Sequence, residues 1–475
     1  MMLRQNIAPD HSPHSLLWKS GVEILTALVS LYVGVTFISL SGGASPLGNI
    51  SVVPFPQLLA TGLVFSLLVV ITMAALGLYD PDLRARSKHL VVRVVISFVV
   101  AFIGMHLALS TFPKFVSISE QALAVGALCA FATVLTIRIL YRTYISYFGV
   151  RRVLVVGAGK KAKLFERLRR KTDLRGLEIV GFVDLKGAGA CVDDNKLIQL
   201  ETSLSEYAKS QQVDELVLAI SDRRNDPSIP TDEILICKSN GIKVIDVVTF
   251  YERQIGKVDL ASISPVGVAL SDTFSGPLLK SARKRLIDII FSLTLLLLAW
   301  PIMILVAAAI LIESNGRGPV FYRQERVGKN GQTFMLLKFR SMRVDAEASG
   351  APQWAKAKDS RVIRVGAFIR KFRLDEIPQL INVLKGDMSV VGPRPERPQI
   401  VRDLSQSIRN YSLRSLVKPG ITGWAQVRYP YGASVEDAEQ KLQFDLYYIK
   451  HFSIFLDLMI MLQTAQVIVW GKGAR

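Results

Sequence analysis

The sequence predicts a membrane protein of mixed class with three parts: a four-helix transmembrane region, a central Rossmann-like α/β domain and an α-rich C-terminal domain with a re-entrant membrane helix. Half of the 475 residues are hydrophobic, which is high for a soluble enzyme. Four apolar stretches of membrane-spanning length occupy the first third, and short apolar runs alternate with polar segments in the middle. The expected boundaries are residues 1–145, 150–274 and 279–475, with the re-entrant helix at 286–312.

The charge balance points to an anionic partner. The formal net charge is +19, from 58 Lys and Arg residues against 39 Asp and Glu. Nucleic acid, an acidic lipid surface and a phosphorylated substrate would all suit this excess. The apolar composition and the lack of a zinc-finger or RNP motif argue against nucleic acid and favour the lipid bilayer and phosphate. Three widely spaced cysteines predict neither a disulfide framework nor a metal site.

The apolar stretches are each close to the ~20 residues that cross a bilayer as a helix. The loop after the second stretch and the segment after the fourth are rich in Arg and Lys, whereas the other two loops carry at most one charge. The positive-inside rule therefore places the N-terminus, the second loop and everything after Tyr141 in the cytoplasm. The alternative is a set of buried helices in a large soluble core. The stretches are Gly21–Leu40, Phe55–Gly77, Leu90–Ser110 and Glu120–Leu140.

The middle of the chain alternates strand-like and helical patterns, as in a parallel sheet covered by helices. A turn containing Gly157 and Gly159 follows the first predicted strand and opens a helix, and Asp184 ends the second strand. This pattern is close to a dinucleotide-binding fingerprint. It is equally consistent with glycines that only permit close packing, so nucleotide binding is one of two interpretations. The predicted strands are Val153–Val156, Ile179–Val183, Glu215–Ala219 and Lys243–Val247.

A long apolar segment, Leu286–Ile312, opens the C-terminal part and is interrupted by Pro301, which removes a helix hydrogen bond and kinks the helix. Basic clusters flank the segment on both sides. A full crossing would place one cluster outside, against the positive-inside rule. We therefore predict a re-entrant helix that breaks at Pro301 and returns to the cytoplasm. The alternative is a fifth, kinked transmembrane helix.

A dense run of charge follows, with the adjacent carboxylates Asp375 and Glu376 at its centre. Carboxylates ligate Mg²⁺ together with substrate phosphates, and a carboxylate can attack phosphorus. Arg and Lys suit phosphate recognition, so these residues predict transfer of a phosphoryl-linked group. Asp375 could instead only cap the next helix, and the arginine-rich segment could bind lipid headgroups. The predicted phosphate- or nucleotide-binding residues are Lys338, Arg340, Arg343, Arg373, Asp387, Arg394 and Arg397.

At these residues the sequence resembles the polyprenyl glycosylphosphotransferase family, the bacterial sugar transferases. The resemblance covers the C-terminal part, and the front of the chain resembles the large exopolysaccharide-priming members in architecture. In many family members the helix break is Ser-Pro, whereas this chain has Trp300-Pro301. The five matching motifs are Phe321–Gly328, Lys338–Arg343, Arg373–Ser389, Val391–Pro395 and Pro419–Val427.

The resemblance implies a monotopic phosphoglycosyl transferase domain that moves hexose-1-phosphate from a UDP-sugar to undecaprenyl phosphate and releases UMP. Glucose is the first expectation for the hexose and galactose the second. Asp375 would attack the β-phosphate and carry the phosphosugar, with Mg²⁺ held at Asp375 and Glu376. The family further implies a homodimer in the bacterial inner membrane, a cytoplasmic catalytic domain, and the first committed step of exopolysaccharide or capsule repeat-unit assembly. We expect Phe452–Trp470 to form an interfacial helix.

The sequence leaves two other functions open. A non-catalytic membrane regulator or scaffold could keep this fold, although the intact Asp375–Glu376 pair argues against it. A membrane-bound nucleotide-sugar dehydratase or epimerase would need a Tyr-x-x-x-Lys pair, which the sequence lacks. The last part of the chain holds one histidine, His451, so a histidine-based mechanism is also disfavoured.

Overall fold

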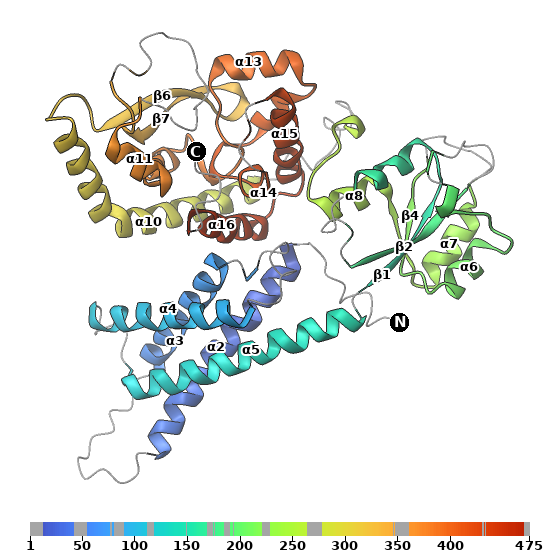
Figure 1. The fold of residues 1–475 in the computed structure, drawn as a ribbon, viewed down its shortest axis with the longest axis horizontal. Helices are drawn as coiled ribbons and strands as arrows, with labels where there is room; N and C mark the ends of the chain where they lie inside the picture. The colour runs from blue at the N-terminus through green and yellow to red at the C-terminus, as the bar shows by residue number, and fades with distance from the viewer. Residues whose placement is uncertain are drawn as a thin grey trace. The chain divides into compact units, whose positions relative to one another are not determined.

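The chain packs into two compact units, one comprising Met1–Met73 and Leu78–Gly256 and the other Ala74–Gly77 and Lys257–Arg475. The first contains N-terminal apolar helices and an α/β domain, and the second contains the C-terminal domain (Figure 1). The computed structural model describes residues 13–41, 55–76, 78–79, 90–111, 118–148, 150–168, 174, 176–184, 191–192, 194–220, 229–263, 278–344, 346, 361–429, 432 and 434–469.

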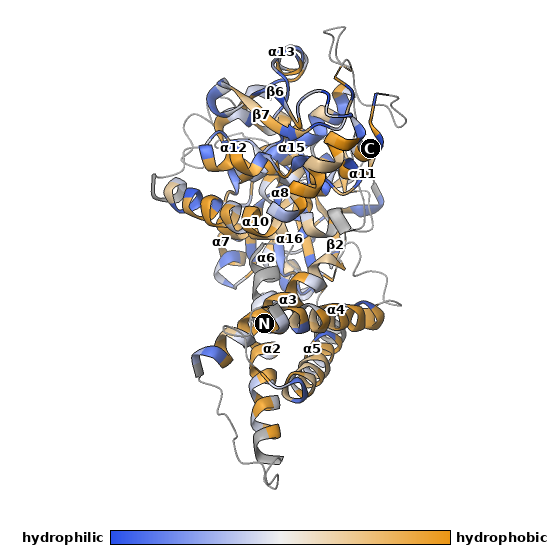
Figure 2. Cartoon of the chain, turned by 90° about the vertical axis from the view of Figure 1, so that its left-hand side faces the viewer, coloured by the Kyte–Doolittle hydropathy of each residue, from blue (hydrophilic) through white to orange (hydrophobic). Residues whose placement is uncertain are grey.

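The four apolar stretches at the front form helices, as predicted. All four meet the length and hydropathy of a membrane span, and Figure 2 shows α3, α4 and α5 as predominantly hydrophobic. α2 and α5 approach closely, since a Cβ on Gly34 would lie 2.5 Å from the backbone N of Gly126. The helices are α2 (Pro13–Ser41), α3 (Phe55–Ala75), α4 (Leu90–Thr111) and α5 (Glu120–Phe148).

An ion pair also joins the first and last of these helices. The Glu23 carboxylate of α2 lies 2.7 Å from Arg138 of α5, and both side chains are largely buried. Tyr79 donates a hydrogen bond to the same carboxylate, so the buried charges are paired and hydrogen-bonded. Residues 80–89, which carry Arg84, Arg86 and Lys88, lie outside the described residues, as does most of the other two connections. The number of crossings and their direction stay predictions.

The α/β domain contains a five-stranded parallel sheet in the order β3-β2-β1-β4-β5, the order of a Rossmann half. α8 and η3 pack on one face and α6 and α7 on the other (Figure 1). The four predicted strands are confirmed, and β3 is an unpredicted fifth. The elements are β1 (Arg151–Val156), η3 (Lys160–Arg167), β2 (Leu177–Val183), η4 (Asp194–Lys196), β3 (Leu197–Ile198), α6 (Leu204–Ser210), β4 (Glu215–Leu218), α7 (Thr231–Ser239), β5 (Lys243–Asp246) and α8 (Val247–Ile255).

The C-terminal domain is mainly helical, with an antiparallel β6–β7 hairpin and a short parallel β8–β9 pair. The segment expected to be interfacial forms the helix α16, and its membrane placement stays a prediction. The elements are η5 (Leu260–Ser262), α10 (Leu278–Glu313), β6 (Phe321–Val327), η6 (Lys329–Gly331), β7 (Thr333–Phe339), α11 (Arg364–Lys371), η7 (Leu374–Glu376), α12 (Gln379–Lys385), β8 (Ser389–Val391), α13 (Pro398–Ser407), η8 (Tyr411–Leu416), β9 (Gly420–Thr422), α14 (Trp424–Arg428), α15 (Val435–Lys450) and α16 (Ile454–Val469).

The predicted membrane segment lies within α10, which is hydrogen-bonded as one helix with Pro301 inside it. Figure 1 shows α10 changing direction along its length. Near its C-terminal end, Val306 and Ile310 pack against Phe339 of β7 and Ile369 of α11. The side chains in the middle of α10 are more exposed: Leu297 and Leu305 are 73% and 70% exposed. α10 is also long and apolar enough to cross a membrane.

Candidate active site

The two adjacent carboxylates lie in a tight turn between α11 and α12. Arg373 adopts a left-handed conformation with φ 55° and turns the chain into η7, where Asp375 and Glu376 are both buried. α12 then begins with Pro378 at its N-cap position, without a side-chain cap, and ends at Gly386, whose φ is 98°. Asp375 therefore does not cap α12, and the interpretation of this residue as only a cap is wrong.

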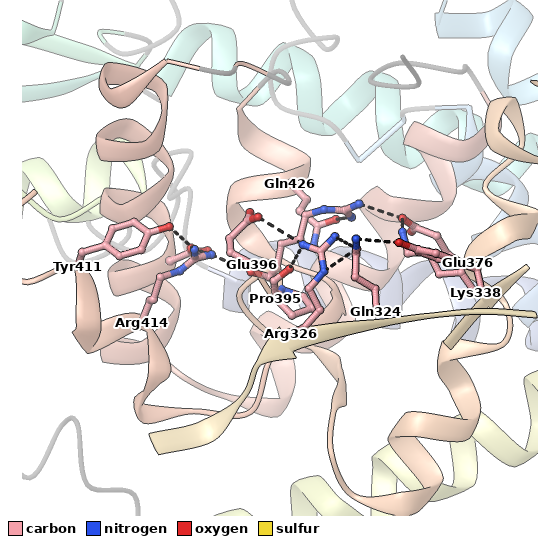
Figure 3. Close-up of polar contacts among 12 residues, drawn as sticks. Gln324, Arg326, Lys338, Glu376, Pro395, Glu396, Tyr411, Arg414 and Gln426 are labelled. Atoms are coloured by element: carbon pink, nitrogen blue, oxygen red, sulfur yellow. Dashed lines mark hydrogen bonds and ion pairs between the residues drawn. The ribbon is translucent and has the colours of Figure 1, made fainter. Parts of the chain in front are cut away.

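Three cations from three parts of the domain surround Glu376. Arg394 and Lys338 approach its Oε1 atom at 3.1 and 3.4 Å, and Arg373 lies 3.6 Å from Oε2. Figure 3 shows Lys338 directed at Glu376. Asp375, by contrast, makes no ion pair within the described part of the chain. The two neighbouring carboxylates thus have different surroundings.

The same asymmetry appears in their protonation. Burial raises the pKa of Asp375, and the Glu376 charge adds to this, while Lys338 and Arg394 act against it. Burial also opposes ionisation of Glu376, but the three surrounding cations outweigh it and lower the pKa of Glu376 to about 2. Burial lowers the pKa of Lys338 despite the attraction of Glu376. Glu376 is therefore a fixed anion, and Asp375 is a more basic carboxylate than usual.

Lys338 is placed by the attachment of β7 to α12. The Asn382 side chain of α12 donates to the Met335 carbonyl at 2.8 Å and accepts from the Leu337 amide at 2.9 Å. These two bonds hold the backbone of β7 next to Lys338. Asn382 also donates to Asp387, just after the end of α12, at 3.3 Å, so Asp387 helps to orient the Asn382 amide.

Arg394 comes from an irregular loop after β8, and its guanidinium donates to Glu376 at 3.1 Å and to Gln426 of α14 at 3.4 Å. A second cation, Arg326 of β6, donates to the Pro395 carbonyl of the same loop at 3.0 Å and lies 3.6 Å from Glu396. Burial lowers the pKa of Arg326 to about 10, with the Glu396 charge opposing this. Figure 3 shows Arg326 and Gln324 beside this loop.

The remaining predicted phosphate-binding residues, Arg340, Arg343 and Arg397, contact other parts of the domain. Arg340 is buried and donates from Nη1 to the Arg317 carbonyl at 2.9 Å, while its Nη2 has no hydrogen-bond partner among the described residues. The Arg343 amide pairs with the Arg361 carbonyl. Arg397 is the residue before α13, and its charge contributes to the lowered pKa of Arg326. Phosphate binding by these residues stays a prediction.

A buried polar cluster that the sequence did not reveal lies behind Arg394. It comprises Tyr411, Arg414 and Asp445, with Arg414 donating to Asp445 at 3.0 Å and to the Tyr411 hydroxyl at 2.6 Å. Burial raises the pKa of Asp445 to about 6, although Arg414 opposes the shift, so the carboxyl is ionised at neutral pH. Asp445 lies on α15, 31 residues from Arg414, and nothing local in the sequence identifies its partner.

The carboxylate pair fits the donor chemistry of Mg²⁺, which prefers oxygen ligands and commonly uses one or two carboxylates plus substrate phosphates. No group of three acidic, His or Cys side chains that could hold a metal occurs in the part of the chain that the structure describes. Asp375 and Glu376 would therefore supply two ligands and leave the rest to the substrate. Because cations already contact both Glu376 oxygens, Asp375 is the more accessible ligand.

In the α/β domain, the glycine-rich turn has a clear packing role. Gly157 has a φ of 105°, and a Cβ there would lie 2.8 Å from the Ala219 carbonyl. Gly159 precedes a 3₁₀ helix rather than an α-helix, and the Asp184 amide donates to the Ile198 carbonyl at 3.4 Å. The packing interpretation is thus supported by the structure, and nucleotide binding at these residues stays a prediction.

Two family models match separate parts of the chain. A family model described as bacterial sugar transferase matches residues 279–471, and one described as CoA-binding domain matches residues 74–226. The UDP-glucose:undecaprenyl-phosphate glucose-1-phosphate transferase of Xanthomonas campestris pv. campestris is 33% identical over 68% of this chain and 68% of its own length.

Two further relatives match a shorter part of the chain at higher identity. The UDP-N-acetylgalactosamine-undecaprenyl-phosphate N-acetylgalactosaminephosphotransferase of Aeromonas hydrophila is 47% identical over 40% of this chain and 45% of its own length. The UDP-glucose:undecaprenyl-phosphate glucose-1-phosphate transferase of Escherichia coli (strain K12) is 41% identical over 42% of this chain and 43% of its own length. The chain thus spans less than half the length of these two relatives. Together with the longer Xanthomonas match, these findings show that the chain is a membrane protein of the bacterial sugar transferase family, the polyprenyl glycosylphosphotransferases.

Proposed function

We propose that this chain transfers a hexose-1-phosphate from a UDP-sugar to undecaprenyl phosphate and releases UMP, as the first committed step of exopolysaccharide or capsule repeat-unit assembly. The observation that carries the proposal is the asymmetry of the carboxylate pair: three cations hold Glu376, whereas Asp375 forms no ion pair within the described residues. A carboxylate without a direct counter-ion, next to fixed cations, suits attack on a phosphorylated substrate. The names of the relatives supply the two substrates.

The reaction proceeds in two displacements at one phosphorus atom. An oxygen of ionised Asp375 attacks the β-phosphorus of the UDP-sugar, and the bond from this phosphorus to the bridging oxygen breaks. The electron pair leaves with UMP, and the phosphosugar remains on Asp375 as an acyl phosphate. An oxygen of undecaprenyl phosphate then attacks the same phosphorus, which frees the Asp375 carboxylate and forms an undecaprenyl diphosphate sugar.

The cations around Glu376 bind and orient the diphosphate. Lys338 and Arg394 share one Glu376 oxygen, so the same carboxylate fixes two donors relative to each other. Arg394 is the more exposed of the two, at 37% against 20%, and is the better placed to reach the substrate. Asp375 and Glu376 would hold a Mg²⁺ ion, and its charge would offset that of the substrate phosphates.

The contacts of α10 support a re-entrant placement, because both ends of the helix contact the same C-terminal domain. Near its start, Arg285 donates to the Leu384 carbonyl at 2.7 Å, and Asp288 accepts from the Val390 amide at 3.0 Å. At its end, Glu313 accepts from the Arg364 amide at 2.7 Å. A straight helix of this length would extend about 54 Å, well beyond one bilayer core. We infer that α10 enters the membrane, turns near Pro301 and returns, with the catalytic domain in the cytoplasm of the bacterial inner membrane.

The test is UMP release from purified protein with undecaprenyl phosphate, with Mg²⁺ or EDTA, and with UDP-glucose, UDP-galactose or UDP-N-acetylgalactosamine. We expect metal-dependent release with one preferred donor, with UDP-glucose as the first candidate. Two of the relatives are named for glucose and one for N-acetylgalactosamine, so the panel includes both. Folded protein that releases no UMP from any donor would favour the alternative of a non-catalytic regulator or scaffold. The homodimer stays a prediction, which the mass of the detergent-solubilised protein tests.

A further inference from the structure

The conformation of the loop that carries Arg394 is fixed by hydrogen bonds from residues outside the loop. We call residues 393–396 the proline loop; it has no regular secondary structure, and Pro393 and Pro395 lack an amide hydrogen. Each of its four carbonyl groups accepts a hydrogen bond from elsewhere in the domain, and two of the four donors are neighbouring residues of β6. The donors are the Gly420 amide to Pro393 at 2.9 Å, Arg414 to Arg394 at 2.9 Å, Arg326 to Pro395 at 3.0 Å and the Val327 amide to Glu396 at 2.9 Å.

The Arg414 bond is the one that acts on Arg394 itself. The Nη2 atom of Arg414 donates to the Arg394 carbonyl, while the Arg394 guanidinium reaches Glu376 at 3.1 Å. A rotation of this peptide unit would displace the guanidinium from Glu376. Arg414 is thus bonded to the backbone of the residue whose side chain contacts Glu376.

Arg414 is itself held by Asp445 of α15. The same Nη2 atom lies 3.0 Å from the Asp445 carboxylate, and the Arg414 and Asp445 side chains are 10% and 3% exposed. Nη1 donates to Tyr411, which Figure 3 shows beside Arg414. A buried guanidinium is costly without a counter-charge, and its planar fork allows several bonds at fixed angles. Asp445 supplies that charge and fixes the plane of the fork.

We propose that Asp445 is a positioning residue that acts on Glu376 through Arg414 and the backbone of Arg394. This inference rests on the proposed transferase function and deepens it, because it assigns the buried cluster of Tyr411, Arg414 and Asp445 to the same reaction. Among the described residues, Asp445 forms no hydrogen bond or ion pair with the carboxylate pair or with Arg394. Removal of the Asp445 carboxylate should lower turnover more than it weakens UDP-sugar binding. A displaced Arg394 guanidinium would no longer stabilise the negative charge that develops in the transition state.

The test compares Asp445→Asn with Ser434→Ala, a control on the same helix. Ser434 caps the start of α15 by accepting from the Asp437 amide at 3.0 Å, so its loss loosens α15 without touching Arg414. We expect Asp445→Asn to lower kcat for UMP release about tenfold or more with a smaller change in KM. Ser434→Ala should keep kcat within about twofold. Equal kcat values in the two variants would overturn the positioning role.

A double-mutant cycle separates positioning from general destabilisation. In an Arg394→Lys background the fork to Glu376 is already lost, so Asp445→Asn should lower kcat by no more than about twofold further. Fully additive losses would show that Asp445 acts through stability alone. If Asp445→Asn does not fold, Arg414→Lys takes its place: it keeps the charge facing Asp445 but loses the fork, and the same loss of kcat is expected. Folded wild-type protein without turnover would instead reject the proposed function.

Discussion

The Glu313 carboxylate at the end of α10 accepts a hydrogen bond from the Arg364 amide at the start of α11, at 2.7 Å. Its second oxygen accepts from the Val365 amide at 2.8 Å. The acid therefore satisfies two of the free amides of α11 and places negative charge at the positive end of that helix. Because α11 leads to Arg373 and the carboxylate pair, this contact links α10 to the candidate active site.

We expect Glu313→Ala to destabilise the attachment of α11 by about 1 kcal/mol, the usual cost of losing a cap. Turnover should fall as well, because Arg373 and the η7 turn come after α11 without a linker. Amide hydrogen exchange of α11 and UMP release measure the two effects. Glu325→Ala is the control, since Glu325 is an exposed acid on β6 of the same domain. If both variants show the same exchange in α11, the capping role is wrong.

The re-entrant placement of α10 predicts that both of its flanks face the cytoplasm. A cysteine at position 282 and one at position 317, both exposed, should react with an impermeant maleimide from the cytosolic side only. The background carries serine in place of Cys129, Cys191 and Cys237, which are free in the native chain. A cysteine at exposed Ser119, in a predicted outer loop, serves as the opposite control. Labelling of position 317 from outside would mean that α10 crosses the membrane.

Periodicity and length predicted the front helices and most of the α/β sheet, but not the individual elements of the C-terminal domain between α10 and α16. The four apolar helices and four of the five strands appear at the expected places, because their patterns extend over several residues. β3 escaped prediction since it has only two residues, Leu197 and Ile198, and is defined by pairing with β2. The glycine turn matched a fingerprint, yet Gly159 leads into a 3₁₀ helix, whose geometry tertiary packing decides.

The candidate site divides in the same way. Asp375, Glu376 and Arg373 are neighbours in sequence, and motif chemistry identified Lys338 and Arg394, which the fold brings to Glu376. Arg414 and Asp445 are 31 residues apart and belong to different elements, so no local pattern joins them. Arg340 shows the converse: its residue type suits phosphate, but in the fold it donates to a backbone carbonyl.

Asp375→Asn should abolish UMP release, with a loss of at least about a thousandfold, because the amide cannot act as the nucleophile. The protein should remain folded and be at least as stable as the wild type at neutral pH. The sign comes from linkage: the pKa of Asp375 is raised in the fold, so its stabilising contribution is present at low pH and is lost as pH rises through that pKa. At neutral pH the buried, ionised carboxylate lowers the free energy of unfolding, and asparagine removes this destabilisation.

Two measurements check this prediction. Thermal unfolding in detergent reports stability, and incubation with radiolabelled UDP-sugar, without undecaprenyl phosphate, reports a covalent phosphosugar on the protein. Glu376→Gln is the companion variant, which should keep the nucleophile but release the cations that Glu376 holds. Turnover at the wild-type rate in Asp375→Asn, or label retained by that variant, would remove Asp375 from the mechanism.

If Asp375 is the nucleophile, Lys338 should affect the pH dependence of the reaction through the pKa of Asp375. Among the groups that lower the pKa of Asp375, Lys338 has the largest effect, and burial together with Glu376 opposes it. Lys338→Met should therefore raise this pKa further. Because attack requires ionised Asp375, activity is lost as pH falls through the pKa, and the acid limb of kcat/KM for UMP release should move to higher pH.

The matched variant is Lys338→Arg, which keeps a positive charge near Glu376. Its acid limb should stay close to that of the wild type, even if its rate is lower at every pH, since the field on Asp375 depends on charge more than on shape. The position of the limb, rather than the rate, is the decisive quantity, because Lys338 is also expected to contact phosphate. A limb that moves to lower pH in Lys338→Met, or equally in both variants, would show that the titrating group is not a carboxylate facing Lys338.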